Sequence, residues 1–244
     1  MTRTIAISNQ KGGVGKTTTV INLAGYLVLA GKRVLVVDND PQGNASAVLG
    51  EGLSERSVYS GQKPIATRTR QLSLLPAGRD LADQEPILAR TDRSRLALRD
   101  ALGAIQDQFD VVLIDCPPTL SLLPVNALLA ADRLILPLQC EYFAMEGMAQ
   151  LLSFVEDLRQ TSDRAPALAG ILLTMHDQRH PLSRQVEADI RAHLGGSTFK
   201  TVIPRDVALA AAPSHGKTIA EYDPLSAGAL AYLAVTKEVL DGLE

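Results

Sequence analysis

A short apolar segment near the N-terminus runs into a turn that contains three glycines, Gly12, Gly13 and Gly15. Glycine takes backbone conformations that a Cβ atom forbids, so successive N–H groups in this turn can point inward at an anion. A helix that begins directly after the turn adds the positive end of its dipole. Lys16 would then reach the β- and γ-phosphates of a nucleotide, and the Thr17 hydroxyl would ligate Mg²⁺. The stretch therefore predicts a phosphate-binding loop.

The usual phosphate-loop pattern asks for glycine five residues before Gly15, where this chain has Gln10. A second lysine, Lys11, stands at the head of the loop instead. The run Lys11-Gly-Gly-Val-Gly-Lys-Thr17 resembles the deviant Walker A motif of the ParA/MinD family. In that family the leading lysine crosses a dimer interface and contacts the nucleotide of the other subunit. The resemblance implies this role for Lys11, comparable to that of an arginine finger.

The same resemblance implies that the loop binds ATP and Mg²⁺. Lys11 and Lys16 would be catalytic lysines, and Thr17 would be a metal ligand. The loop residues expected to contact the nucleotide are Lys11, Gly12, Gly13, Val14, Gly15, Lys16, Thr17 and Thr18.

A polar turn, residues 38–44, follows the apolar segment 34–37. Its proline and glycine cannot continue a strand. Taken alone, an Asp-x-Asp pair most often only caps a turn. This turn, however, closely matches the DxDPQGN switch I of the ParA/MinD family. The resemblance implies that Asp40 orients or polarises the hydrolytic water and belongs to the metal site, while Asp38 organises the turn.

An apolar run that begins at Phe109 ends in Asp115. This is the Walker B pattern, in which a central strand delivers an aspartate beside the phosphate loop to hold Mg²⁺ or its water. An aspartate at a strand end is weak evidence for a Mg²⁺ site when it stands alone, but it is strong evidence when the sequence also contains the phosphate-binding loop. Two prolines then enforce an extended exit, and residues 115–126 resemble the switch II segment of the family.

The segment that begins at Pro204 resembles a Pro-Arg-Asn/Asp stretch that lies near the adenine base in family members. By this resemblance Pro204 and Asp206 would contact the nucleotide. One departure is Ala208, because family members usually carry a further arginine at this position.

Three arginines are candidate DNA contacts: Arg179, Arg184 and Arg205. Relatives use an arginine in the loop that matches Arg179 to contact DNA. The helix of Arg184 also carries Glu187 and an aspartate, so a solvated helix face explains that arginine at least as well.

Apolar segments alternate with helical patterns along the chain. This order predicts a doubly wound α/β fold with a mostly parallel sheet of seven or eight strands, flanked by helices, in a single ParA-like ATPase domain over residues 1–244. Strands are expected at residues 5–7, 34–37, 72–75, 109–115, 132–138, 167–174 and 199–203. Helices are expected at about 17–30, 182–194 and 225–243, with an interrupted helical pattern over 80–105.

Composition narrows the class of protein. The 244 residues are 46% hydrophobic and carry a net charge of -3, which excludes a broadly basic nucleic-acid coat but allows a local basic patch. Cys116 and Cys140 lack metal spacing, and we expect both to be reduced core thiols. No segment approaches about 20 apolar residues, and no leader precedes the first strand, so we expect a cytoplasmic protein.

The resemblance to ParA/Soj ATPases runs from Lys11 to Lys217. It implies a slow ATPase switch that forms a homodimer in the ATP state and binds double-stranded DNA without sequence preference. A ParB/Spo0J-like partner would stimulate hydrolysis, and the cycle would serve chromosome or plasmid segregation on the nucleoid.

Other classes of function share parts of this pattern. A MinD-like membrane switch shares the loop, but the predicted C-terminal helix is acidic where a membrane-surface helix should be basic. A biosynthetic ATPase of the dethiobiotin synthetase type lacks the leading lysine. A nitrogenase-type iron protein needs cysteines placed to bridge a dimer, which Cys116 does not match. An ATPase that positions a protein cargo would carry the same motifs and stays open.

Overall fold

The computed structural model describes residues 2–243 with gaps at 92–93, 120, 142–143 and 163. Within these residues, seven strands form one sheet in the order β3-β4-β2-β5-β1-β6-β7. All neighbouring strands are parallel except the pair β3–β4. The strands are β1 (Arg3–Ile7), β2 (Val34–Asp38), β3 (Ile65–Ala66), β4 (Leu72–Leu75), β5 (Val111–Asp115), β6 (Arg133–Gln139) and β7 (Ala167–Thr174).

Helices connect the strands and follow the last one. The α-helices are α1 (Lys16–Leu29), α2 (Asn44–Leu49), α3 (Leu81–Leu88), α4 (Ala97–Gly103), α5 (Leu122–Ala130), α6 (Ala144–Thr161), α7 (Pro181–Leu194), α8 (Val207–Ala211), α9 (Ile219–Tyr222) and α10 (Ala227–Asp241). Among the short 3-10 turns, η1 (Val58–Ser60) and η5 (Ala212–His215) follow α2 and α8 respectively.

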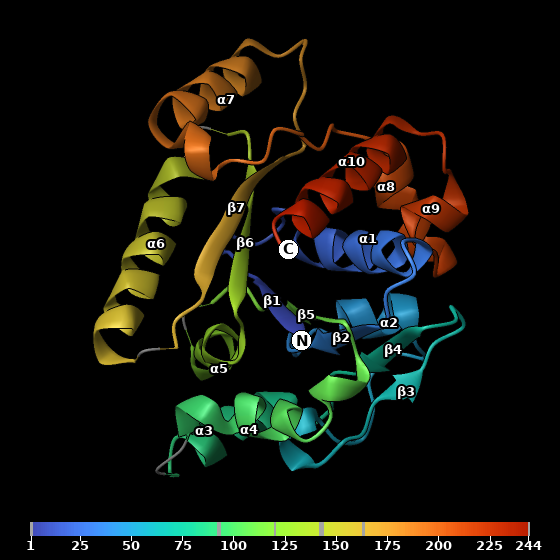
Figure 1. Ribbon diagram of the computed structural model, residues 1–244, viewed down its shortest axis with the longest axis vertical. Helices are drawn as coiled ribbons and strands as arrows, with labels where there is room; N and C mark the ends of the chain where they lie inside the picture. The colour runs from blue at the N-terminus through green and yellow to red at the C-terminus, as the bar shows by residue number, and fades with distance from the viewer. Residues whose placement is uncertain (1, 92–93, 120, 142–143, 163, 244) are drawn as a thin grey trace.

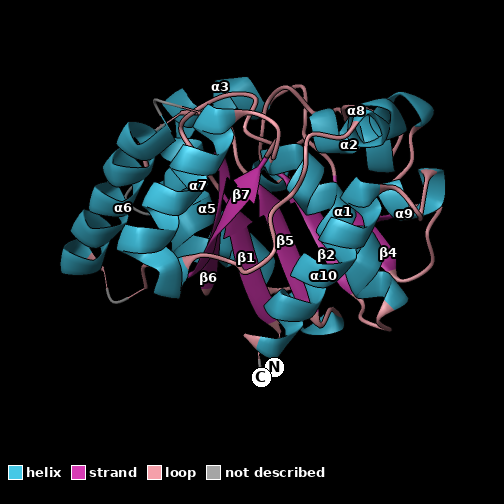
Figure 2. Cartoon of the chain, turned by 90° about the horizontal axis from the view of Figure 1, so that it is seen from above, coloured by secondary structure: helices cyan, strands magenta, loops and turns pink. Residues whose placement is uncertain are grey.

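The central strands are buried on both faces, as parallel strands covered by helices must be. In β1, Ala6 faces one apolar core, whereas Ile5 and Ile7 face the other. β2 and β5 alternate in the same way. Helices α4 to α7 cover the first core, and α1, α2 and α8 to α10 cover the second. Figure 2 shows the strands between these helices, and Figure 1 shows α10 beside α1.

The order of the strands creates a ligand-binding edge. β1 lies between β5 and β6, and the chain leaves it through α1 to reach β2 on the far side of β5. Crevices at such a switch point, outside the carboxyl ends of the strands, are where α/β sheets bind ligands. The register pairs Asp115 with Ile7 on one side and with Asp38 on the other. The predicted doubly wound α/β fold is confirmed, and the predicted functional segments meet at this edge.

One predicted strand is wrong. Residues 199–203 run beside β7, with Phe199 N–H donating to Ile171 O and Ile203 N–H to Leu173 O. Sheet pairing is limited to isolated bridges at the flanking Thr198 and Pro204, so no eighth strand forms. The Phe199 ring lies over Gly170, and the segment runs beside the outer edge of β7 without the continuous pairing of a strand. An apolar pattern cannot separate these two arrangements, because both bury the same side chains.

Gly78 permits a close approach of two chain segments. A Cβ at this position would clash with the backbone at Arg56 and Ser57 and with the Asp80 carboxylate. Since backbone atoms cannot rotate away, we expect Gly78→Ala to lower the free energy of unfolding by about 1–3 kcal/mol. Gly103→Ala is the matched control: a Cβ there would meet no atom within 4 Å, so this change should be neutral or slightly stabilising. Urea unfolding of both variants checks this, and equal midpoints would contradict it.

Candidate functional site

The glycine turn between β1 and α1 has the geometry of an anion cradle. Gly13 and Gly15 have φ angles of 74° and 90°, in the left-handed region that favours glycine. A Cβ at Gly12 or Gly13 would meet no atom within 4 Å, so this side of the turn is open. Gly15 is the N-cap of the 14-residue helix α1, whose first turn carries no acidic residue. The amino end of α1 could therefore receive an anion.

Lys16 is a buried cation beside this cradle. Its side chain is 7% exposed, and its ammonium donates to the backbone carbonyl of Lys11 at 3.0 Å. Burial lowers the pKa of Lys16, while Asp115 and Asp40 favour its charged form. A carbonyl is a weak partner for a buried ammonium, so a phosphate oxygen would be a better one.

Asp115, at the end of β5, is fully buried, and neither of its carboxylate oxygens has a hydrogen-bond partner within the described structure. Burial raises the pKa of Asp115 well above its usual range, and the nearby Asp38 raises it further. The Thr17 hydroxyl and Lys16 lie close enough to lower it. An unpartnered buried carboxylate is unfavourable, and a divalent cation beside it would remove that penalty.

The donor set around Asp115 fits a metal bound together with a nucleotide. Across the described residues, no three His, Cys, Asp or Glu side chains are grouped so that they could hold a metal ion by themselves. Mg²⁺ is typically held by one or two carboxylates and by the phosphates of its nucleotide, not by a cage of protein ligands. Asp115 and Thr17 supply one carboxylate and one hydroxyl, which suits magnesium carried by a nucleotide.

Asp38 and Asp40 make different contacts in the turn after β2. The Asp38 carboxylate accepts hydrogen bonds from the Ser46 N–H and hydroxyl at 2.7 and 2.6 Å, and the Ser46 hydroxyl in turn accepts from Ala77 N–H. Asp38 thus organises the turn, as expected. The Asp40 carboxylate accepts from Gln42 N–H at 2.9 Å and lies close enough to affect the ionisation of Lys16 and Asp115.

Lys11 is held within its own subunit. Its N–H donates to the Asn9 side chain at 3.0 Å, and its ammonium forms an ion pair with Glu141 at 2.8 Å. The two paired side chains are 38% and 47% exposed, so the pair contributes no more than about 1 kcal/mol. This ion pair is weak enough to be exchanged for a stronger anion.

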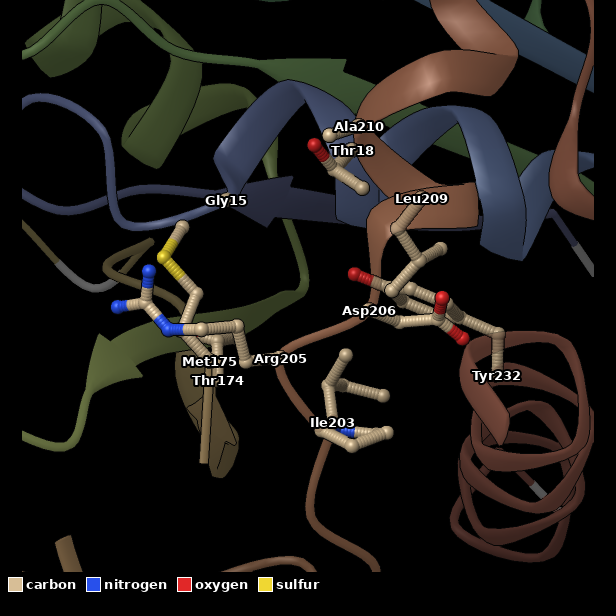
Figure 3. A pocket seen from close by; sticks show the side chains of 11 residues that line it. Gly15, Thr18, Thr174, Met175, Ile203, Arg205, Asp206, Leu209, Ala210 and Tyr232 are labelled. Carbon is tan, nitrogen blue, oxygen red and sulfur yellow. The ribbon is translucent and has the colours of Figure 1, made fainter. Parts of the chain in front are cut away.

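A cavity of about 210 Å³ opens beside the start of α1. Figure 3 shows Gly15 and Thr18 on one side of it and Asp206 and Tyr232 on another. Pro204 also lines it, so the structure brings the predicted base-contacting segment next to the phosphate loop. The Asp206 carboxylate is already engaged, because it accepts from Ala208 N–H at 2.8 Å and from Gly228 N–H at 2.7 Å. Asp206 therefore shapes the cavity by joining α8 to α10.

Two residues at the site were not predicted from the sequence. The Thr174 hydroxyl, at the end of β7, donates to Val14 O at 2.9 Å and so ties the glycine turn to β7. The Tyr232 hydroxyl lies 3.1 Å from the Thr19 hydroxyl and joins α10 to α1. The only sequence signal for Thr174 is its place at the carboxyl end of a strand, where α/β proteins bind ligands.

The three candidate DNA-contacting arginines gather around one loop, residues 176–180. Arg205 N–H donates to the His176 carbonyl at 2.9 Å, and the Arg184 side chain donates to Gln178 O at 3.3 Å. All three side chains are exposed. Arg179 forms a two-pronged ion pair with Asp177 at 3.0 Å, which lowers the pKa of Asp177 to about 2.

Both cysteines are free and buried, as expected for core thiols. Burial raises the pKa of Cys140 to about 11, so this thiol stays protonated and unreactive at neutral pH.

Burial of Asp38 makes stability depend on pH. Desolvation raises its pKa to about 6, although the Ser46 hydrogen bonds oppose the shift. The folded state then binds a proton more tightly than the unfolded chain, so this contribution is complete below about pH 4 and is lost as pH rises to about 6. We expect Asp38→Asn to flatten this dependence by on the order of 2 kcal/mol. Urea unfolding from pH 4.5 to 7.5 without nucleotide or metal checks it; parallel curves for the two proteins would contradict it.

Comparison with known proteins agrees with this geometry. A family model described as "AAA domain" matches residues 2–167. The chromosome-partitioning ATPase Soj of Thermus thermophilus is 50% identical over 243 residues, covering 98% of this chain and 95% of that protein. The chromosome partitioning protein ParA of Caulobacter vibrioides is 46% identical over 250 residues, covering 98% and 94%.

A solved structure resembles the whole chain. Cobyrinic acid a,c-diamide synthase from Mycobacterium smegmatis, with a bound ATP analogue and magnesium, superposes with a TM-score of 0.83 at 35% identity. The match covers 100% of this chain and 96% of that one. Because the glycine loop, both switch segments and the sheet order lie within these full-length similarities, this chain belongs to the ParA/Soj family of partitioning ATPases.

Proposed function

We propose that this protein is an ATP-dependent dimerising switch that binds DNA without sequence preference and segregates a chromosome or plasmid. The observation that carries the proposal is the buried, unpartnered carboxylate of Asp115 beside an open glycine cradle and the amino end of α1. A magnesium–nucleotide complex satisfies all three features at once, because its phosphates suit the cradle and its cation suits the carboxylate.

Residues of this chain would hold the nucleotide at both ends. The N–H groups of residues 12–18 and the Lys16 ammonium would bind the phosphates, and the cavity lined by Pro204 and Asp206 would take the base. Thr17, Asp40 and Asp115 would hold Mg²⁺ directly or through water. When bound, the cation would neutralise the charge that develops on the phosphates as the terminal phosphoryl group is transferred to water.

Asp40 would orient or polarise the attacking water. This assignment is supported by its position in the turn after β2, 6% exposed and close to both Lys16 and Asp115. A carboxylate near the phosphates can accept a hydrogen bond from water and fix its direction of attack.

Lys11 would leave Glu141 and contact the phosphates of a second subunit. The Lys11–Glu141 ion pair is half exposed and weak, whereas a triphosphate in a closed dimer offers more negative charge and less solvent. ATP would therefore favour the dimer, and cleavage of the terminal phosphate would release it.

Arg179, Arg184 and Arg205 would contact DNA phosphates. One copy offers only these three candidate arginines on a chain with a net charge of -3, so two copies joined in a dimer would bind DNA better at physiological salt. A ParB-like protein would stimulate hydrolysis and release the DNA, and the protein would act on the nucleoid. The names of the 50% and 46% identical relatives favour this cycle over the biosynthetic activity named for the 35% identical structure.

The rival role of a MinD-like or cargo-positioning ATPase differs in the surface on which the switch acts. No helix in the described ranges is long and apolar enough to cross a membrane. Retention on DNA but not on anionic vesicles, with ATP present, favours segregation; the reverse result favours a membrane cargo.

We expect nucleotide-dependent dimerisation to require Lys11 and not to require Asp40. With ATP and Mg²⁺, Asp40→Ala should remain a dimer with turnover reduced at least about 100-fold, because water is no longer oriented. Lys11→Ala should bind ATP but stay monomeric and show no stimulated turnover. Light scattering with ADP and with ATP, together with phosphate release, measures both. Stimulated hydrolysis by Lys11→Ala, or normal turnover by Asp40→Ala, would contradict the assigned role.

DNA affinity is expected to follow the charge of the 176–180 loop. Asp177→Asn should strengthen binding by freeing Arg179, and Arg179→Ala with Arg184→Ala should weaken it and reduce the salt slope by about 0.9 per lost phosphate contact. Fluorescence anisotropy of labelled duplexes at several salt concentrations measures this. Arg33→Ala is the matched control, since Arg33 pairs with Asp110 at the amino ends of β2 and β5, away from the carboxyl end of β7. If Arg33→Ala and Arg179→Ala weakened DNA binding equally, the proposed DNA-contacting role of the 176–180 loop would be contradicted.

A further inference from the structure

Asn39, the residue before Asp40, is completely buried and bonds to three other segments. Its side-chain N–H₂ donates to Leu123 O at 2.9 Å, and its side-chain oxygen accepts from the Tyr59 hydroxyl at 2.9 Å. Its backbone N–H donates to Asp115 O at 3.0 Å. The turn that carries Asp40 is therefore bonded to η1, to the end of β5 and to the start of α5.

Leu123 is the meeting point of this network. Its N–H belongs to the first turn of α5 and so lacks a partner within the helix, but it donates to the Glu85 carboxylate of α3 at 3.0 Å. Its side chain is 1% exposed and packs with Ala77 and Leu81, with Tyr59 against them. Glu85 thus holds the N–H of the same residue whose carbonyl is held by Asn39.

The chemistry at position 39 requires an amide. Leu123 O can only accept a hydrogen bond, and Tyr59, whose pKa is raised far above its usual range by burial, keeps its proton and donates it. A carboxamide meets both demands, because it carries a donor and an acceptor. A carboxylate could not donate to Leu123 O, and an aliphatic side chain could neither donate to it nor accept from Tyr59, which would leave the Tyr59 hydroxyl without this acceptor.

Asp40 has few other restraints from outside its own turn. Its carboxylate accepts from Gln42 N–H, and its carbonyl accepts from Gly43 N–H, both within the turn. The turn itself is fixed on one side through Asp38, Ser46 and Ala77, and on the other side through Asn39. The position of Asp40 relative to Asp115 therefore depends on what Asn39 contacts.

We infer that Asn39, Tyr59 and Glu85 form a positioning network that aligns Asp40 with the phosphate loop by tying the turn 38–44 to the start of α5. The inference rests on the proposed function, since it concerns ATP hydrolysis. The network bonds to residues 115 and 123 and not to the side chains of the glycine loop. It should therefore act on the chemical step and leave nucleotide affinity almost unchanged.

Removal of a single hydroxyl tests the network. Tyr59→Phe, Asn39→Leu and the double variant are compared with the wild type for kcat and for the Kd of a fluorescent ATP analogue. Each single variant should lower kcat by about tenfold, because a small misplacement of a catalytic group is costly, while Kd stays within about twofold. The double variant should be no slower than Asn39→Leu, since both changes break the same connection.

A pair of substitutions at Glu85 separates positioning from a general structural role. Glu85→Gln keeps an oxygen that accepts from Leu123 N–H and should retain the wild-type kcat, whereas Glu85→Leu should lower it to the level of Tyr59→Phe. Val155→Ala controls for lost stability. Val155 is a buried residue of α6 in the first apolar core, so this change should lower the unfolding midpoint without changing kcat. Unfolding curves identify any variant that fails to fold, and the Tyr59 and Glu85 variants suffice without Asn39→Leu.

The outcomes distinguish this inference from the proposed function. A wild type without ATPase activity overturns both. An active wild type with unchanged kcat in Tyr59→Phe and Glu85→Leu overturns the network alone. A loss of kcat that Val155→Ala reproduces, or a loss in Kd as large as the loss in kcat, also overturns it.

Discussion

A buried carboxylate at the end of three parallel strands, without a hydrogen-bond partner among the described residues, is the constraint on which the rest of the site depends. Asp115 is placed there by the register of β5 between β1 and β2, which sets it beside Asp38 and below the glycine turn. Burying charge without compensation is unfavourable, so the fold keeps this arrangement only where a ligand or a shared proton offsets it. The open cradle, Thr17 and Lys16 surround it with groups suited to a nucleotide and its cation.

Around this centre, three positively charged groups are held by contacts that a ligand can replace. Lys16 donates to a carbonyl and Lys11 pairs with a half-exposed glutamate, while Arg179 is neutralised by Asp177. The neutral contacts are firmer: Thr174 fixes the glycine turn to β7, and Asn39 fixes the acidic turn to α5. The structure thus combines a rigid frame of buried hydrogen bonds with exchangeable ion pairs, as a nucleotide-driven switch requires.

Local patterns in the sequence were sufficient for the glycine loop, for Asp115 at a strand end and for the alternation that makes the sheet. Where long-range contacts decide, sequence reasoning failed. Thr174 lies 160 positions from Val14, whose carbonyl it bonds, and Tyr232 lies 213 positions from Thr19 in α1. Residues 199–203 were expected to be a strand because their apolar pattern is that of one, but their packing over Gly170 is a tertiary effect. Asp206, expected only at the nucleotide, proved to join α8 to α10.

On this interpretation, the buried carboxylate of Asp115 binds a cation that arrives with the nucleotide. Calorimetric titration of ATP, with and without Mg²⁺, into the wild type and into Asp115→Asn tests it most directly. Magnesium should tighten ATP binding by the wild type and have little effect on the variant, whose neutral amide no longer needs the cation. An equal gain from magnesium in both proteins would contradict the account.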